Sequence, residues 1–332
     1  MNKTYLVIDF SNMFHRMKHT SSKGASLDER LGLVIHQMLV GVRSAWMRFN
    51  ADHVVFALEG KSWRKHIYPA YKMNRVAQRL KRKPSEIEAD EEFMKVENQF
   101  IEYLMKNTNC SVIRSKNAEG DDIIATFIKD RPNDNHIIVS SDKDFYQLVN
   151  DQVKIYDAMQ GQIITRDGLF DDRMRPIIDK KTKQQKTLGD PEWLLFEKCI
   201  RGDSSDNIFS AYPRVRKKGT KNKVGLLEAF DDRNSKGYEW NSIMKHTWED
   251  NKGNKKVVKD EYEMNKLLID LSLIPDFIED EIRKDIEKET TKNVDTSSIG
   301  FQFMKLCSKF DLIQLSETSS YYVEFLGKRY VE

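Results

Sequence analysis

The residues of this chain best suited to chemistry are carboxylates that border apolar segments. The stretch "HIIVSSDKDFYQLV" (136–149) runs from an apolar segment into two aspartates, Asp142 and Asp144, with one lysine between them. Other acids border apolar segments in the same way, and the full set is Asp9, Glu59, Glu119, Asp121, Asp122, Asp142 and Asp144. Ligands of open α/β sheets bind beyond the carboxyl ends of the strands. We therefore expect these carboxylates to meet at one edge of a sheet.

Carboxylates brought that close together repel one another, and a divalent cation removes the repulsion. Oxygen ligands without accompanying His or Cys suit Mg²⁺, or Mn²⁺ as its substitute, better than zinc. A set of this size can hold two ions roughly 3.5–4 Å apart, a spacing that brackets a phosphate. A plainer alternative stays open, in which the acids at 119–122 and 142–144 only cap helices or turns.

Strand and helix patterns that must position these acids alternate along the first half of the chain. The strand candidates are 4–9, 53–59, 110–114 and 136–141, and the helix candidates are 27–49, 84–107 and 119–130. Residues 153–165 read as a hairpin that turns at Gln160 and Gly161. This alternation predicts an α/β fold with a mainly parallel central sheet flanked by helices.

Beyond about residue 185 the strand signal fades and the sequence becomes helical and charged. We therefore predict an α/β domain at 1–185 and a smaller helical C-terminal domain at 186–332. The lysine-rich residues 179–190 are the best linker candidate, and 245–261 have the composition of a mobile loop.

Composition limits the class of protein. Lys and Arg number 55 against 52 Asp and Glu, so the net charge of +3 does not itself indicate a polyanionic partner. Three widely spaced cysteines fit neither a disulfide framework nor a zinc site. We see no signal peptide and no membrane-length apolar run, so we expect a cytoplasmic protein without a membrane partner.

Residues 61–83 form a basic segment of nine Lys or Arg without any acid, interleaved with Trp63, Tyr68 and Tyr71. Cations that pair with phosphates beside aromatics that stack on bases are typical of a single-strand nucleic-acid channel. The candidate contacts are Arg64, Lys65, Tyr68, Tyr71, Lys72, Arg75, Arg79 and Lys81. A solvated basic helix is the alternative.

A second acid-free run, "RVRKKGTKNK" (214–223), could contact the phosphates of a duplex. Its candidate contacts are Arg214, Arg216, Lys217, Lys218 and Lys221. A flexible charged loop is again the alternative.

The order and spacing of several blocks resemble the 5′-nuclease (flap endonuclease) superfamily, most of all the ribonuclease H branch of T-even bacteriophages. The blocks are "YLVIDFSNMFHR", "FALEGKSWRKHIYPAYKMNR", "EGDDIIATF", "VSSDKDFYQLV" and "RGDSSDN", which span most of residues 4–207. The resemblance implies a PIN-like 5′-nuclease core whose helical arch, at 61–83, passes a 5′ single strand, followed by a helical DNA-binding domain.

The resemblance also implies roles for individual residues. Asp206, with Asp203 nearby, joins the metal-site carboxylates, and Lys72 and Arg75 match a catalytic basic pair that steadies the scissile phosphate. The family usually has Asp where this chain has Glu59, and its glycine-marked helix-turn-helix is poorly kept in residues 212–230.

The function implied is Mg²⁺-dependent 5′ to 3′ exonuclease, flap endonuclease and ribonuclease H activity on RNA–DNA hybrids, duplex DNA or 5′ flaps. It further implies removal of lagging-strand RNA primers in phage DNA replication, within the host cytoplasm. A single-stranded DNA-binding protein and a sliding clamp are the expected partners, and we expect a monomer.

Two alternatives to this function stay open. One is a Mn²⁺-dependent glycosyltransferase that uses the Asp142/Asp144 D-x-D pattern, although the basic segments disfavour it. The other is a non-catalytic, structure-specific DNA-binding protein.

Overall fold

The computed structural model describes residues 2–20 and 26–330, and the chain forms two units. Unit 1 comprises Met1–Ser62, Arg82–Leu188 and Pro275–Glu332, whereas unit 2 comprises Trp63–Lys81 and Gly189–Ile274. The predicted division at 185/186 is close to the passage into unit 2 at 188/189. It differs in two respects, because most of the basic segment belongs to unit 2 and the last 58 residues belong to unit 1.

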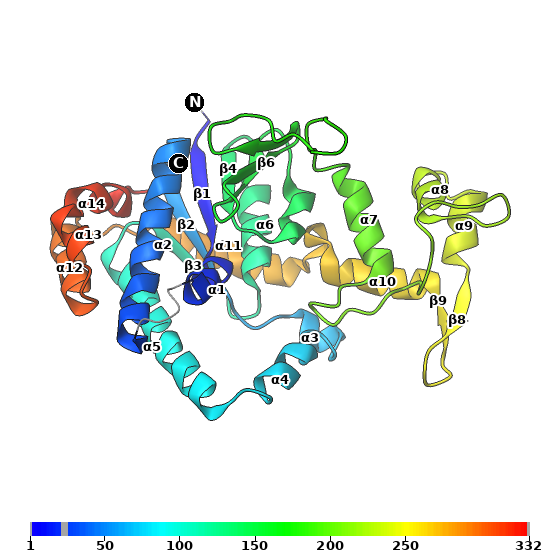
Figure 1. Cartoon of the computed structure of the whole chain (residues 1–332), viewed down its shortest axis with the longest axis horizontal. Coiled ribbons are helices and arrows are strands. Elements are labelled where there is room, and N and C mark those ends of the chain that lie inside the picture. Colours follow the sequence, from blue (N-terminus) through cyan, green and yellow to red (C-terminus); the bar gives the residue numbers. More distant parts are fainter. Residues whose placement is uncertain (1, 21–25, 331–332) are drawn as a thin grey trace. The chain divides into compact units, whose positions relative to one another are not determined.

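A seven-stranded sheet organises unit 1, in the order β3-β2-β1-β4-β5-β6-β7 (Figure 1). The strands are β1 (Thr4–Asp9), β2 (His53–Leu58), β3 (Ser111–Arg114), β4 (Asn135–Val139), β5 (Val153–Asp157), β6 (Gln162–Thr165) and β7 (Gly168–Asp171). β1 to β5 are joined in parallel pairs, and β6 and β7 extend the sheet beyond β5 in antiparallel pairs. The mainly parallel α/β fold predicted from the sequence is therefore confirmed.

Helices cover both faces of this sheet. α1 (Phe10–Thr20), α2 (Leu27–Phe49) and α5 (Pro84–Asn107) share one apolar core with alternate residues of the central strands, among them Leu6, Ile8, Val54 and Phe56. α6 (Gly120–Lys129) contacts β1, β2 and β3, and α11 (Asp276–Thr290) contacts β3 and α6. β2 is buried at all six positions, as expected for a central strand covered on both faces.

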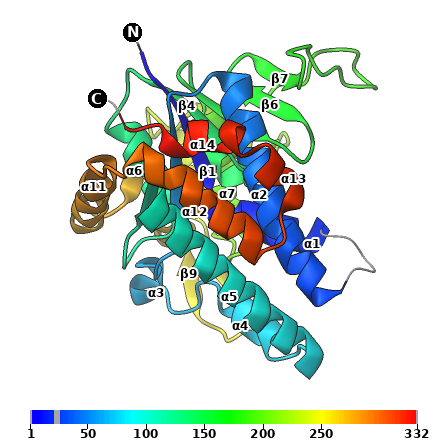
Figure 2. The same ribbon diagram turned by 90° about the vertical axis from the view of Figure 1, so that its left-hand side faces the viewer.

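The C-terminal helices complete the core of unit 1. α12 (Thr296–Lys309), α13 (Ile313–Glu317) and α14 (Ser319–Gly327) bury Phe303, Leu315 and Phe325 in the core that α2 and α5 supply. Figure 2 shows α12 running beside α5. The apolar stripe of each C-terminal helix is thus paired with unit 1, which is why residues 275–332 do not form one domain with 186–274.

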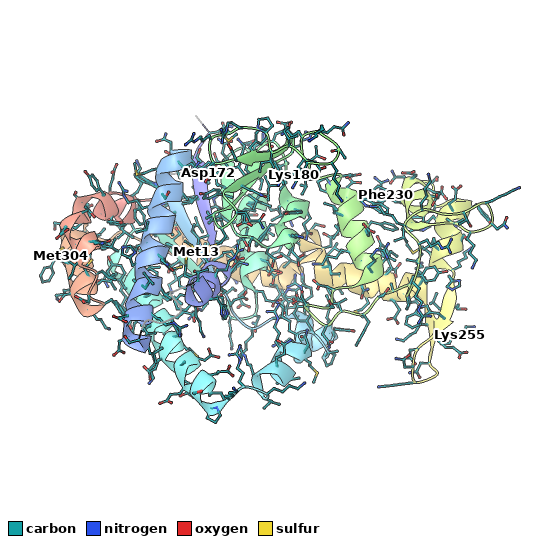
Figure 3. The ribbon with its side chains drawn as sticks, in the orientation of Figure 1. Met13, Asp172, Lys180, Phe230, Lys255 and Met304 are labelled. Atoms are coloured by element: carbon teal, nitrogen blue, oxygen red, sulfur yellow. The ribbon has the colours of Figure 1, made fainter. Side chains whose placement is uncertain are left out.

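Unit 2 is helical, with one hairpin. Its elements are α3 (Arg64–Ile67), α4 (Met73–Arg79), α7 (Pro191–Arg201), α8 (Leu226–Asp231), α9 (Tyr238–Met244), β8 (Thr247–Glu249), β9 (Lys255–Val257), α10 (Val258–Ile269) and η2 (Leu271–Leu273). Trp193, Phe196 and Phe230 form an aromatic cluster in its apolar core. Figure 3 labels Phe230. The predicted loop at 245–261 is instead the β8–β9 hairpin and the start of α10.

Local elements agree with the sequence patterns to different degrees. α2 and α5 have the predicted bounds, and the hairpin at 153–165 is present as β5 and β6, with Gly161 in the left-handed region at φ 59°. α1 and β7 were not predicted. The linker candidate begins inside unit 1, because the Lys186 carbonyl accepts from the Leu169 amide at 2.8 Å. In the described part of the chain, no helix is long and apolar enough to span a bilayer.

Candidate functional site

The carboxyl ends of three neighbouring parallel strands bring acids to one edge of the sheet in unit 1. Asp9 ends β1 and pairs in register with Ala57 of β2, two residues before Glu59. The Gly120 amide, at the start of α6, donates to Glu59 Oε2 at 3.3 Å. β4, on the other side of β1, leads into the segment with Asp142 and Asp144. The topology thus ends the segments that carry these acids at the same edge of the sheet. Their shared role as metal ligands stays a prediction.

Three of the predicted ligands form a close cluster at the start of α6. Glu119, Asp121 and Asp122 each offer a carboxylate oxygen, and these oxygens all lie within 4.8 Å of one another. Glu119 and Asp122 are buried. The Glu119 amide donates to Asp122 Oδ2 at 3.0 Å, and the Ser62 hydroxyl donates to Glu119 Oε2 at 2.6 Å. These hydrogen bonds orient Glu119 and Asp122 within the cluster.

A second chain of hydrogen bonds orders the acids after β1 and β4. The Ser140 hydroxyl donates to Asp9 Oδ2 at 2.8 Å and accepts from the Asp142 amide at 3.0 Å. Asp142 Oδ1 in turn accepts from the Asp144 amide at 2.9 Å. Ser62 and Ser140 are residues that the sequence analysis missed. Their small hydroxyls, next to the predicted ligands in sequence, were the signal available.

Capping and metal binding are compatible at this site. Asp122 closes a capping box with Glu119, and Asp142 caps η1 (Lys143–Leu148), so the plainer alternative describes a real part of the geometry. A cap engages one carboxylate oxygen, whereas a carboxylate has two. Three mutually close carboxylates, two of them buried, provide the hard oxygen donors and the local negative charge that suit Mg²⁺ or Mn²⁺. The residues present therefore fit a divalent cation.

Asp203 and Asp206 lie in unit 2, where both are ion-paired. The Asp206 carboxylate lies 2.6 Å from Arg75 Nη2 and 3.6 Å from Lys72 Nζ, and it accepts from the Tyr71 hydroxyl at 3.0 Å. Asp203 lies 2.8 Å from Lys198 Nζ. Burial raises the pKa of Asp203, but the hydrogen bonds from Lys198 and Ser205 outweigh it and lower this pKa to about 2. A metal-ligand role for these two acids stays a prediction.

The same loop holds the start of α4 in place. The Lys72 amide donates to the Asp206 carbonyl at 2.8 Å, and Asn74 Nδ2 donates to the Ser204 carbonyl at 2.9 Å. Asn207 Nδ2 donates to the Ala70 carbonyl at 2.7 Å. Lys72 caps α4 in the left-handed region at φ 55°. Hydrogen bonds to residues 203–207 therefore hold the backbone that carries Lys72 and Arg75, the predicted catalytic pair.

Two of the predicted nucleic-acid contacts in the basic segment need correction. The Arg64 side chain is 1% exposed, donates to the Leu268 carbonyl at 2.7 Å and lies over the Trp63 ring. Tyr71 is 2% exposed and packs against Cys199 and Leu268. Both residues serve the core of unit 2, so they have no surface to offer a nucleic acid in this structure.

The other predicted contacts keep accessible surface. Tyr68 and Lys72 are half-buried, and the exposed contacts of the basic segment are Lys65, Arg75, Arg79 and Lys81. In the second run, all the predicted contacts are exposed, namely Arg214, Arg216, Lys217, Lys218 and Lys221. These remain the candidate phosphate contacts.

Comparison with known proteins gives a family match over the first half of the chain. A family model described as the N-terminal resolvase-like domain of 5′-3′ exonucleases matches residues 4–174. DNA polymerase I of Rhizobium leguminosarum is 32% identical over 183 residues, which cover 54% of this chain and 15% of the polymerase. A 5′-3′ exonuclease of Buchnera aphidicola is 24% identical over 235 residues, which cover 69% of this chain and 71% of that protein. The chain spans only 15% and 18% of the length of two DNA polymerase I relatives.

Solved structures share the fold. A flap endonuclease of bacteriophage T5, solved in a complex with DNA and metal ions, superposes with a TM-score of 0.56. The alignment covers 86% of this chain and 99% of the phage protein, at 18% sequence identity. Another structure of the T5 5′-exonuclease holds divalent zinc ions and gives the same TM-score of 0.56.

Proposed function

We propose a function from the premise that this chain belongs to the family of 5′-3′ exonucleases with an N-terminal resolvase-like domain. Members of this family are metal-dependent nucleases. We assign this chain 5′ to 3′ exonuclease and flap endonuclease activity that depends on Mg²⁺ and leaves products with a 5′ phosphate. The single observation that carries the metal dependence is the cluster of Glu119, Asp121 and Asp122, whose oxygens lie within 4.8 Å of one another.

The carboxylates would share the work of holding Mg²⁺. Glu119, Asp121 and Asp122 supply the close cluster, and Asp9, Glu59, Asp142 and Asp144 come from the ends of the neighbouring strands. When bound, the cation supplies an activated water and stabilises the charge on the leaving 3′ oxygen. The hydrogen bonds from Ser62 and Ser140 orient Glu119 and Asp9, which would reduce the reorganisation that ion binding requires.

Lys72 and Arg75 supply positive charge for the scissile phosphate in this proposal. Arg75 is exposed and Lys72 is half-buried, and both cations already bind a carboxylate, Asp206. A carboxylate and a phosphate oxygen offer these side chains similar charge and similar hydrogen-bond acceptors. The ion pairs with Asp206 therefore indicate that Lys72 and Arg75 are preorganised to bind an anion.

The substrates we propose are RNA primers on a DNA template, duplex 5′ ends and 5′ flaps, with ribonuclease H activity as part of this range. The role would be removal of lagging-strand primers, in phage replication if the chain is phage-encoded. A single-stranded DNA-binding protein and a sliding clamp would bring the enzyme to its substrate. α14 buries Tyr322, Phe325 and Leu326 in unit 1, so docking of such a partner would fall to other residues.

One assay tests the proposal. Primer, nicked and flap substrates labelled at the 5′ end are incubated with Mg²⁺ or with EDTA, and product sizes are read at nucleotide resolution. We expect Mg²⁺-dependent cleavage that Asp144→Asn abolishes while DNA binding is kept. Asp167→Asn, which removes an exposed carboxylate from the β6–β7 turn, is the matched control. Wild-type cleavage by Asp144→Asn would refute the metal assignment.

The alternatives are less well supported. A glycosyltransferase would require a sugar-nucleotide site, and the family match over residues 4–174 does not favour it. A non-catalytic DNA-binding protein would leave every substrate intact whether or not EDTA is present, so the same assay separates it from the nuclease.

A further inference from the structure

A loop in unit 2, residues 212–225, carries the second basic run between α7 and α8. Its cations are exposed, and they are Arg214, Arg216, Lys217, Lys218, Lys221 and Lys223. Acids of both neighbouring helices contact this loop. Glu197 of α7 lies 3.9 Å from Lys217 Nζ, and Glu228 in the first turn of α8 binds the loop backbone.

The Glu228 carboxylate joins the two sides of the loop. Gly219, on the outgoing side, donates its amide to Oε1 at 3.1 Å and to Oε2 at 3.0 Å. Gly225, on the returning side, donates its amide to Oε2 at 3.0 Å. A single side chain therefore closes the loop at its base.

The loop can close this tightly only because both contact points are glycines. A Cβ on Gly225 would lie 2.3 Å from the Gly219 nitrogen, and a Cβ on Gly219 would lie 2.6 Å from the Lys223 carbonyl oxygen. Real Cβ contacts are not that short, so any other residue would force the two sides apart. The spacing Gly219–Gly225–Glu228 is thus a structural unit that the family's glycine pattern did not reveal.

Further backbone hydrogen bonds join the basic residues to the first residues of α8. The Leu226 amide donates to the Arg216 carbonyl at 3.0 Å, and the Leu227 amide donates to the Lys217 carbonyl at 2.9 Å. The tip is closed by Thr220 and Lys223, whose amide and carbonyl pair at 2.7 Å. The backbone that bears the cations is therefore ordered from Arg216 to Lys223.

We propose that Glu228 is a positioning residue that holds this loop in the shape in which Arg216, Lys218 and Lys221 contact the phosphates of a duplex. The proposal rests on the proposed nuclease function, because it assigns a geometry to the duplex part of the substrate. Amide donors, including its own backbone N–H and those of Gly219 and Gly225, lower the pKa of Glu228, so the carboxylate stays ionised at neutral pH.

A charge effect and a positioning effect of Glu228 predict opposite changes in DNA affinity. A carboxylate among cations repels phosphates, so neutralising it should tighten DNA binding if charge alone matters. Positioning predicts the opposite result. Both oxygens of Glu228 accept from the Gly219 amide, so in Glu228→Gln the new NH₂ group faces that amide whichever way the side chain is turned. Two donors then oppose each other, so the loop opens and the cations lose their common arrangement.

The experiment measures the affinity of the full chain for a fluorescent 20-base-pair duplex in EDTA, between 50 and 200 mM salt. We expect Glu228→Gln to bind about tenfold more weakly and to lower the slope of log affinity against log salt by roughly 2, because about two phosphate contacts are lost. Glu263→Gln on α10, an exposed acid 3.7 Å from Lys259, is the matched control and should bind within about twofold of wild type.

A second variant, Gly225→Ala, changes the shape of the loop without changing its charge. Gly225→Ala leaves every charge in place but pushes the loop apart, so it should weaken duplex binding to a similar extent while the melting temperature of the chain is checked in parallel. Unchanged or tighter binding by Glu228→Gln, or wild-type binding by folded Gly225→Ala, overturns the proposal. If wild type itself shows no salt-dependent duplex binding, the proposed function fails instead, and the positioning role falls with it.

Discussion

The Arg75 guanidinium lies 2.6 Å from the Asp206 carboxylate, which also lies 3.6 Å from Lys72 Nζ. The acid that the family resemblance assigns to the metal site thus holds the two cations that it assigns to the phosphate. Asp206 is 13% exposed, so water weakens this interaction less than it would weaken a surface pair. The two assigned roles of Asp206, metal ligand and partner of the cations, make different predictions.

Variants of Arg75 and Asp206 should not act independently on cleavage. Arg75→Ala removes a cation from the scissile phosphate, and we expect about 100-fold slower single-turnover cleavage. Asp206→Asn releases the anchored cations, so it should slow the same step. Because both changes disturb one unit, the double variant should be no more than about threefold slower than the slower single variant. Rates are measured with saturating enzyme and Mg²⁺.

The opposite outcome would assign Asp206 to the metal. If the two fold-changes multiply in the double variant, Asp206 acts separately from Arg75 and the ion pair has no part in the mechanism. Arg79→Ala is the matched control, because Arg79 is another exposed cation of α4, at its last position. It should affect binding and leave the single-turnover rate near that of wild type.

A divalent cation should stabilise the fold through the Glu119, Asp121 and Asp122 cluster. A ligand that binds only the native state at 100 times its Kd adds about 2.7 kcal/mol to the free energy of unfolding. We therefore expect Mg²⁺ or Mn²⁺ to raise the melting temperature of wild type by several degrees over NaCl of equal ionic strength. Asp121→Asn should lose most of this increase, and Asp167→Asn should keep it. An equal increase in Asp121→Asn would exclude this cluster as the binding site.

The sequence predicts best the elements whose signals are local. α2 has the predicted bounds because its apolar stripe is preceded by a capping box between Ser26 and Glu29. α5 likewise begins with Pro84 at its first turn. The acids at the sheet edge were predictable because parallel strands end on the same side, so a short apolar run followed by an acid is sufficient.

Features that depend on distant partners were not predictable from local patterns. Arg64 and Tyr71 are of the residue types that bind nucleic acids. They are nevertheless buried, because they contact Cys199 and Leu268, which lie about 130–200 positions away in the sequence. In the same way, nothing in the periodicity of α12 says whether its apolar stripe meets unit 1 or unit 2. Contacts of this kind follow from the packing of the whole chain.

The assignment of the C-terminal helices to unit 1 gives a stability prediction with an internal control. Phe303 on α12 is fully buried and stacks on Tyr322, with the two ring centroids 5.4 Å apart. Phe301, two residues earlier, is 62% exposed. Phe303→Ala should lower the free energy of unfolding by about 3–5 kcal/mol, because it removes a large ring and leaves a cavity. Phe301→Ala should change it by less than about 0.5 kcal/mol. Urea denaturation measures both, and equal effects would contradict the packing of α12.

A buried histidine of β2 should make the fold sensitive to mild acid. His53 is 1% exposed, with Nε2 2.9 Å from the Ser111 hydroxyl and Nδ1 3.2 Å from the Lys328 carbonyl. Burial lowers the pKa of His53 from 6.5 to about 4. Between pH 4 and 6.5, His53 is mostly protonated in the unfolded chain but mostly neutral in the native state. The free energy of unfolding therefore falls as the pH drops below about 6.5, and the loss is complete below about pH 4.

At pH 5 this single group should cost about 2 kcal/mol relative to pH 7.5, because protonation there favours the unfolded chain by roughly 1.5 pH units. His53→Gln cannot take up this proton, so its stability should fall less between the two pH values, even if it is less stable at both. His19→Gln, an exposed change at the end of α1, should keep the pH dependence of wild type. Urea denaturation of the three proteins at pH 7.5 and 5 measures the difference. Parallel losses in all three would mean that other groups, and not His53, set the acid sensitivity; buried His136, whose pKa is also lowered by burial, is one of them.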